Sequence, residues 1–103
     1  MIVPLIVHVK HFLDANGIKF FPRWFEKAVK LLLEREGFLS IGYAYDSNEE
    51  GCVNLWLEFE CLEKLKKWGT SKLHDDLVNE LNPYRVKPYV ATRYQLEQKI
   101  CMK

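Results

Sequence analysis

The sequence predicts an α+β fold in which helices cover an antiparallel sheet. Four stretches have the alternating or β-branched composition of strands. Two regions between them have apolar residues at the three- and four-residue spacing of amphipathic helices. The 103 residues, 49% of them hydrophobic, suit one domain with its own core. The elements follow in the order β-α-β-β-α-β.

The first half of the chain predicts a strand, a helix and a second strand. Residues 2–11 are β-branched and apolar on both faces, which predicts a strand covered on both sides. Residues 14–17 are a turn signal. The helix that follows begins within residues 18–22 and ends at Gly37, in the manner of a C′ glycine. Phe38–Tyr45 alternates bulky and small residues and is the second strand.

The second half continues with a hairpin and a broken helical region. Polar residues 46–51 predict the hairpin loop, and residues 53–59 the third strand. Residues 62–68 predict a short helix, and Gly69-Thr70-Ser71 interrupts it, with Ser71 or Thr70 capping a second segment that Pro83 ends. Residues 86–96 predict the last strand. This order is the ferredoxin-like arrangement.

The domain boundary and the expected partner follow from this arrangement. The tail 97–103 has no clear pattern, so the domain is expected to span residues 1–96. Helices are expected on one sheet face, with the valines, leucines and phenylalanines of the first and third strands on the other. An apolar face of that size needs a partner, and a second copy of the same chain is the expected one.

Composition excludes several classes of protein. Lys plus Arg number 15 and Asp plus Glu 14, so the chain lacks the basic excess that nucleic-acid binding requires. The apolar N-terminal run is too short for a membrane span and has no basic region before it. The three cysteines have no metal-ligand spacing, which predicts no metal site and favours free thiols in a reducing cytoplasm.

Five short motifs, taken together in their order and spacing, are moderately specific for one protein family. They are Trp24 with Ala28, Glu36-Gly37-Phe38, Trp56-Leu57-Glu58-Phe59, Trp68-Gly69-Thr70-Ser71-Lys72-Leu73-His74, and Asn82-Pro83-Tyr84. In these motifs the chain resembles the antibiotic biosynthesis monooxygenase domain family, a dimeric α/β-barrel group. The resemblance implies a homodimer whose sheets pack into a barrel, with a cleft between sheet and helices in each subunit. It also implies a small hydrophobic or aromatic ligand and no cofactor.

The resemblance implies three catalytic candidates. His74 is the candidate base or hydrogen-bond donor at the cleft mouth, Trp68 the candidate aromatic wall, and Tyr43 the candidate phenol that holds a quinone-like oxygen. Each has a structural alternative. His74 also fits a capping or surface histidine, Trp68 a core anchor, and Tyr43 a tyrosine that only packs.

Three further residues are candidates for substrate binding, namely His8, Tyr89 and Arg93. Because side chains alternate along a strand, His8 and His11 lie on opposite faces, and His8 is the better candidate. A histidine at the dimer seam is the alternative for His8. Arg93 either meets an anionic substrate group or pairs with Glu58 across strands.

Three functions stay open from the sequence. The first is a cofactor-independent monooxygenase acting on a small aromatic or polyketide-like substrate, as relatives oxidise anthrones with molecular oxygen. The second is a non-catalytic dimeric module that binds a small molecule. The third is heme binding or degradation, for which Trp68 fits. The first strand, however, lacks the asparagine of heme-degrading relatives, and their heme-ligating histidine would fall near Val78.

Overall fold

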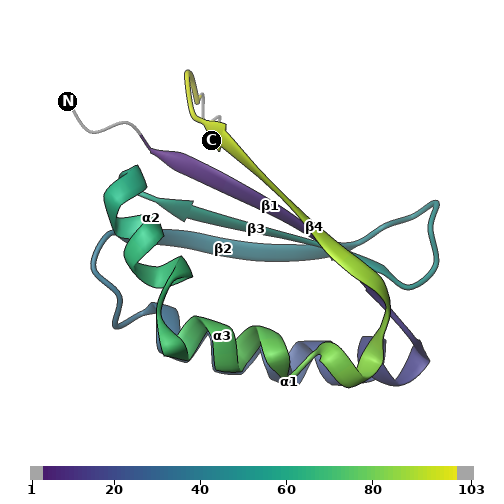
Figure 1. The fold of residues 1–103 in the computed structure, drawn as a ribbon. Helices are drawn as coiled ribbons and strands as arrows, with labels where there is room; N and C mark the ends of the chain where they lie inside the picture. Colours follow the sequence, from purple (N-terminus) through teal and green to yellow (C-terminus); the bar gives the residue numbers. More distant parts are fainter. Residues whose placement is uncertain (1–3, 100–103) are drawn as a thin grey trace.

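The computed structural model of the chain describes residues 4–99, and it confirms the α+β, ferredoxin-like class. The predicted residues 2–3 of the first strand and the last four residues of the tail lie outside this range. Three helices lie on one side of a four-stranded sheet (Figure 1). The elements are β1 (Leu5–Leu13), α1 (Ala15–Leu32), β2 (Phe38–Tyr45), β3 (Cys52–Phe59), α2 (Leu62–Gly69), α3 (Lys72–Asn79), a 3-10 turn (Asn82–Tyr84) and β4 (Arg85–Gln95).

The sheet has the strand order β2-β3-β1-β4, and every neighbouring pair is antiparallel. β1 is therefore central, between β3 and β4. In this register His8 of β1 lies opposite Trp56 of β3 and Thr92 of β4. These three side chains share one face of the sheet, because paired residues point to the same side.

α1 begins earlier than the sequence predicts. Asp14 is its N-cap, and the Asp14 carboxylate accepts a hydrogen bond from the backbone N–H of Gly17 at 2.8 Å. The turn signal in residues 14–17 is thus the first turn of the helix, and Pro22 lies inside the helix on its exposed side. The helix ends at Leu32, before the predicted Gly37. Gly37 has φ +84° and makes the turn into β2.

α3 begins after the predicted break, and Ser71, one of the two predicted capping residues, is its N-cap. The hydroxyl of Ser71 accepts a hydrogen bond from the backbone N–H of His74 at 3.2 Å. The same hydroxyl donates to the carbonyl of Trp68 at 2.7 Å. One serine side chain therefore holds Trp68 at the end of one helix and His74 in the first turn of the next.

The core lies between the helices and the sheet, and this corrects one expectation. The valines, leucines and phenylalanine of β3 face the helices and are buried: Val53, Leu55, Leu57 and Phe59. They do not form the sheet face that the helices leave uncovered, which we call the open face. That face carries a mixed set with several exposed apolar side chains: Ile6, His8, Lys10, Asn54, Trp56, Glu58, Val90, Thr92 and Tyr94. The helices cover the continuously apolar face, since burying it excludes the most hydrocarbon from water.

None of the helices in the described range is long and apolar enough to span a membrane.

Candidate functional site

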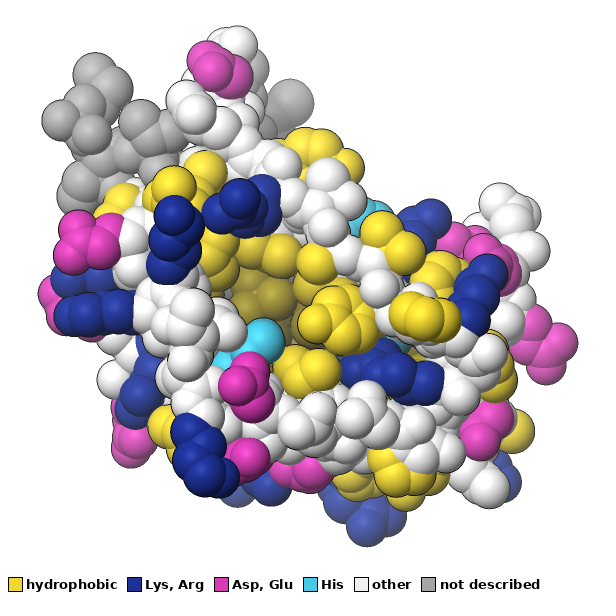
Figure 2. All heavy atoms as spheres, viewed as in Figure 1, with side chains coloured by type: hydrophobic (Ala, Val, Ile, Leu, Met, Phe, Trp, Pro, Cys, Tyr) yellow, Lys and Arg dark blue, Asp and Glu magenta, His cyan; other side chains and the backbone are white. Residues whose placement is uncertain are grey.

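A pocket of about 390 Å³ lies between the helices and the sheet. Its walls come from all four strands and all three helices and are largely apolar. Figure 2 shows the hollow, floored by hydrophobic side chains, with a histidine and basic side chains around it. The apolar lining residues are Val7, Val9, Trp24, Ala28, Leu32, Ile41, Leu55, Leu57, Leu65, Trp68, Leu77, Val78 and Ala91. An apolar pocket with few polar groups, in this size range, is typical of small-molecule sites.

The polar groups of the pocket are mostly hydrogen-bond donors or positive charges. They are His11, Lys66, Thr70, His74, Tyr89 and Arg93. No acidic side chain belongs to the described lining. Groups of this kind bind a negatively charged oxygen atom of a ligand in preference to a cationic group. The pocket therefore favours an apolar ligand that carries a carbonyl, phenolate, enolate or carboxylate oxygen.

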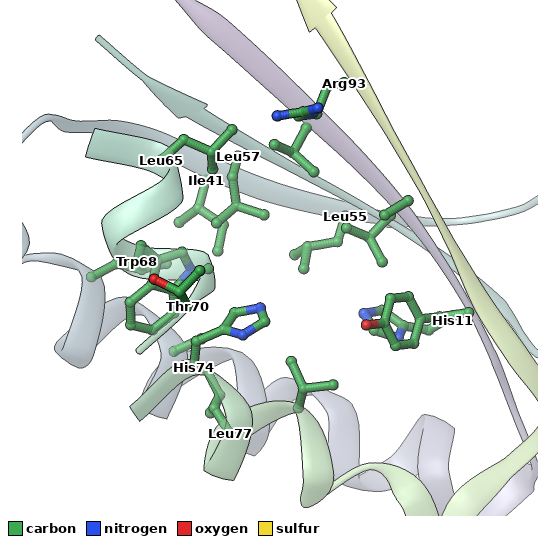
Figure 3. Close-up of a pocket in the computed structure, with 18 of the residues that line it drawn as sticks. His11, Ile41, Leu55, Leu57, Leu65, Trp68, Thr70, His74, Leu77 and Arg93 are labelled. Atoms are coloured by element: carbon green, nitrogen blue, oxygen red, sulfur yellow. The ribbon is translucent and has the colours of Figure 1, made fainter. Parts of the chain in front are cut away.

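Trp68 and His74 form one wall of the pocket. Trp68 is 5% exposed, and its ring meets the His74 ring edge-on with the centroids 5.5 Å apart. The Nδ1 of His74 lies 3.2 Å from a carboxylate oxygen of Asp75. A carboxylate only accepts hydrogen bonds, so in the neutral imidazole of His74 the proton lies on Nδ1 and the lone pair on Nε2. The His74 ring points into the cavity (Figure 3), and this arrangement presents a proton acceptor to a ligand.

Trp24 also ties the helices together beneath the pocket. Its indole Nε1 donates to the buried carbonyl of Leu77 at 2.7 Å, which joins α1 to α3. The position of α3, and with it that of His74, thus depends on this bond.

His11 lines the pocket from β1 and is only 2% exposed. Its Nδ1 lies 2.9 Å from Nη1 of Arg85. Burial, and then the nearby charge of Arg85, lower the pKa of His11 from 6.5 to about 3. His11 is therefore neutral at physiological pH. The sequence analysis favours His8, although alternation along β1 places His11 on the same face as Val7 and Val9.

Tyr89 and Arg93, the two candidates for substrate binding on β4, line the pocket together with Ala91 between them. Arg93 does not pair with Glu58. β4 pairs with β1 and not with β3, and Glu58 lies on the open face, where it accepts a hydrogen bond from Ser40 at 3.1 Å. Arg93 remains free to meet a ligand at the end of the pocket shown in Figure 3.

His8 and Tyr43 are not brought to this pocket. His8 lies on the open face, stacked on Trp56 with centroids 4.9 Å apart, and its Nε2 donates to Asn54 Oδ1 at 2.7 Å. Tyr43 packs against Phe21 and Phe25, with centroid distances of 5.0 and 4.6 Å. Of the six candidates, the structure brings together four: Trp68, His74, Tyr89 and Arg93.

Val78 occupies the place where the resemblance puts a heme-ligating histidine, and it lines the pocket with an apolar side chain. Within residues 4–99, no three His, Cys, Asp or Glu side chains gather to hold a metal ion.

Comparison with known proteins identifies the fold. No family model matches the sequence, and no curated protein does. Solved structures do match. A Caulobacter crescentus protein, provisionally named an antibiotic biosynthesis monooxygenase, has TM-score 0.83 and 15% identity over 94% of this chain and 92% of its own. A conserved Methanosarcina mazei protein has TM-score 0.82 and 14% identity over 93% and 95%.

A third match is to a mutant of SnoaB, a cofactor-independent oxygenase from Streptomyces nogalater. Its TM-score is 0.80 at 6% identity, over 94% of this chain and 96% of its own. The agreement covers nearly the whole chain in each case. The fold of this chain is the fold of the antibiotic biosynthesis monooxygenase domain family.

Proposed function

We propose that the chain is a cofactor-independent monooxygenase acting on a small aromatic, polyketide-like substrate in the helix-side pocket. The observation that supports it is the combination of an apolar cavity with a proton acceptor, Nε2 of His74, and donors that face the same space. The likeness in fold to a cofactor-independent oxygenase agrees with this proposal.

The chemistry needs only a base, an oxyanion environment and oxygen. An anthrone has a CH₂ group conjugated with a ketone, and His74 Nε2 takes one proton from it. The electron pair moves towards the ketone oxygen, and the carbanion reduces O₂ and forms a C–O bond. Protonation gives a hydroperoxide, which loses water and leaves a second carbonyl. The substrate gives up four electrons, and O₂ provides one atom to the product and one to water.

The remaining pocket residues bind and enclose the substrate. Trp68 gives a flat aromatic wall, and stacking on it contributes on the order of 1 kcal/mol beyond burial. Tyr89 and Arg93 are the proposed contacts to substrate oxygens. The apolar walls exclude water, which strengthens each polar interaction with the enolate.

The test is oxygen uptake with anthrone, together with quantification of the quinone. We expect one O₂ consumed per quinone formed, and a His74→Gln variant slower by about 100-fold, the lower end of general-base contributions. Lys72→Gln is the matched control, because Lys72 lies in the same turn of α3 with its side chain 85% exposed. Full activity in His74→Gln would refute the assigned role.

A non-catalytic binding module is the second candidate. The most buried polar group of the pocket, His11, has a pKa of about 3 and is a weak base, as suits binding better than proton transfer. A ligand that raises the melting temperature of the protein and is recovered chemically unchanged would favour this function. Heme is a third candidate, and heme titration without a Soret shift would remove it.

We further propose a cytoplasmic homodimer that pairs through the open sheet face. Trp56, Val90 and Tyr94 are 41%, 53% and 52% exposed on that face, and burying such side chains is favourable. Cys52 and Cys61 are free thiols, as a reducing compartment requires. Light scattering is expected to give twice 12.2 kDa, and Trp56→Glu a species of half that mass. A monomeric wild type would contradict this pairing.

A further inference from the structure

His11 and Arg85 form a buried pair that the proposed reaction above does not use. Arg85 makes three hydrogen bonds: Nη1 to His11 Nδ1 at 2.9 Å, Nε to Asn82 Oδ1 at 3.0 Å and Nη2 to the carbonyl of Val78 at 3.3 Å. Its guanidinium also lies over the Tyr89 ring, 4.9 Å from the centroid. The guanidinium is thus fixed on several sides, and the His11 ring with it.

The chemistry of this pair determines which nitrogen of His11 carries the proton. A guanidinium is a donor and has no acceptor atom, so His11 Nδ1 must present its lone pair to Arg85. A neutral imidazole carries one proton, and that proton is then on Nε2. The rest of the ring is packed by Phe21, Trp24 and Tyr89, with centroid distances of 6.0, 5.8 and 5.7 Å.

The Nε2–H of His11 is available to a ligand. His11 lines the pocket, and its ring hydrogen bond within residues 4–99 is made by Nδ1 and not by Nε2. Figure 3 shows the His11 and His74 rings on either side of the cavity. His74 presents a lone pair and His11 presents a hydrogen, each fixed by a charged neighbour.

The geometry points to His11 as the specificity-determining donor to the ketone or enolate oxygen of a flat aromatic ligand, with Arg85 as its positioning residue. This inference rests on the proposed function for the identity of the ligand class. His74 takes the proton from the substrate, the electron pair moves to the substrate oxygen, and the His11 Nε2–H hydrogen bond to that oxygen strengthens as its charge grows. No proton is transferred to or from His11.

The first test uses wild-type protein and the ¹⁵N shifts of the His11 imidazole. We expect a pyridine-type Nδ1 and a pyrrole-type Nε2, unchanged between about pH 5.5 and about pH 8, where an ordinary histidine titrates. Arg85→Met is expected to mix the two tautomers, a change that a merely structural role would not produce. A protonated ring at about pH 5.5, or a proton on Nδ1, would overturn the inference.

The second test compares two ligands of nearly the same shape, 9-fluorenone and fluorene, which differ at one carbon: it is a C=O group in fluorenone and a CH₂ group in fluorene. NMR titration gives the ratio of their Kd values. A neutral hydrogen bond changes this ratio by about five-fold. We expect His11→Asn, whose Oδ1 can replace Nδ1 as the acceptor for Arg85, to lose about that factor. Lys10→Gln, next to His11 on β1 but on the open face, is the matched control and is expected to keep it.

The outcomes separate this inference from the proposed function. If both ligands bind and His11→Asn keeps the wild-type ratio, His11 is not the donor, and the pocket remains an aromatic site. If neither ligand binds the wild type, both the site and the donor are refuted. If the ratio falls as expected and anthrone consumes no oxygen, the donor stands and the monooxygenase activity does not.

Discussion

Acid should destabilise this protein through His11. The pKa of His11 is about 3 in the folded chain and 6.5 ordinarily, because burial and then the charge of Arg85 disfavour the imidazolium. Between these values the unfolded chain binds one more proton than the folded chain. The stability that depends on a neutral His11 is therefore complete above the unfolded pKa and is lost as pH falls from 6.5 towards 3.

The size of the effect follows from the same two values. Each pH unit below the unfolded pKa costs about 1.4 kcal/mol, so acidification to about pH 4.5 removes roughly 2.5 kcal/mol. For a domain whose total stability is on the order of 5–15 kcal/mol, this is a large fraction. A shift of that size is well within the resolution of chemical denaturation.

Urea unfolding, followed by circular dichroism, measures this loss in wild type and in His11→Asn at about pH 7 and about pH 4.5. The variant does not titrate there, so it should lose roughly 2.5 kcal/mol less than wild type. Glu36 and Asp46, whose pKa values are lowered by hydrogen bonds from Lys64 and from the Asn48 backbone, also weaken the fold in acid. They are present in both proteins and cancel in the comparison. Equal losses in the two proteins would refute the argument.

Two further stability predictions follow from the packing. Trp24→Phe removes the donor to the buried carbonyl of Leu77 and should cost about 1–3 kcal/mol in urea unfolding, and a change below about 0.5 kcal/mol would mean that the bond adds nothing. Gly51→Ala puts a Cβ 2.5 Å from the carbonyl oxygen of Leu13 at φ +80°, and should cost more than about 2 kcal/mol. Gly69→Ala meets no atom within 4 Å and is the control, with an expected change within about 1 kcal/mol.

Local chemistry was enough to predict much of the fold. The hairpin loop at residues 46–51 and the Ser71 cap were predicted because short polar sequences determine them. The start of α1 was predicted too late, because Asp14 fits an N-cap and a turn equally well. The first turn of α1 packs against a residue far along the chain: a Cβ on Gly17 would be 2.6 Å from the Cβ of Tyr84. A contact of that kind gives no signal in the local sequence around Asp14.

The site was predicted less completely, for a non-local reason. Alternation along β1 separates His8 from His11, but it does not say which face the helices cover. That depends on the residues of β3, such as Leu55 and Leu57, for which the sequence predicts the open face and which the structure shows to be buried under the helices. Once the faces are assigned correctly, His11 joins the pocket and His8 leaves it. The partner of His11, Arg85, is 74 residues away and gives no local signal.

Methyl NMR of the protein with 9-fluorenone tests the ligand site most directly. The helix-side pocket predicts that the methyl signals of Val9, Leu55 and Leu77 shift on binding, because these residues line the cavity. Shifts confined to Ile6 and Val90, on the opposite face of the sheet, would contradict the site and with it the proposed function.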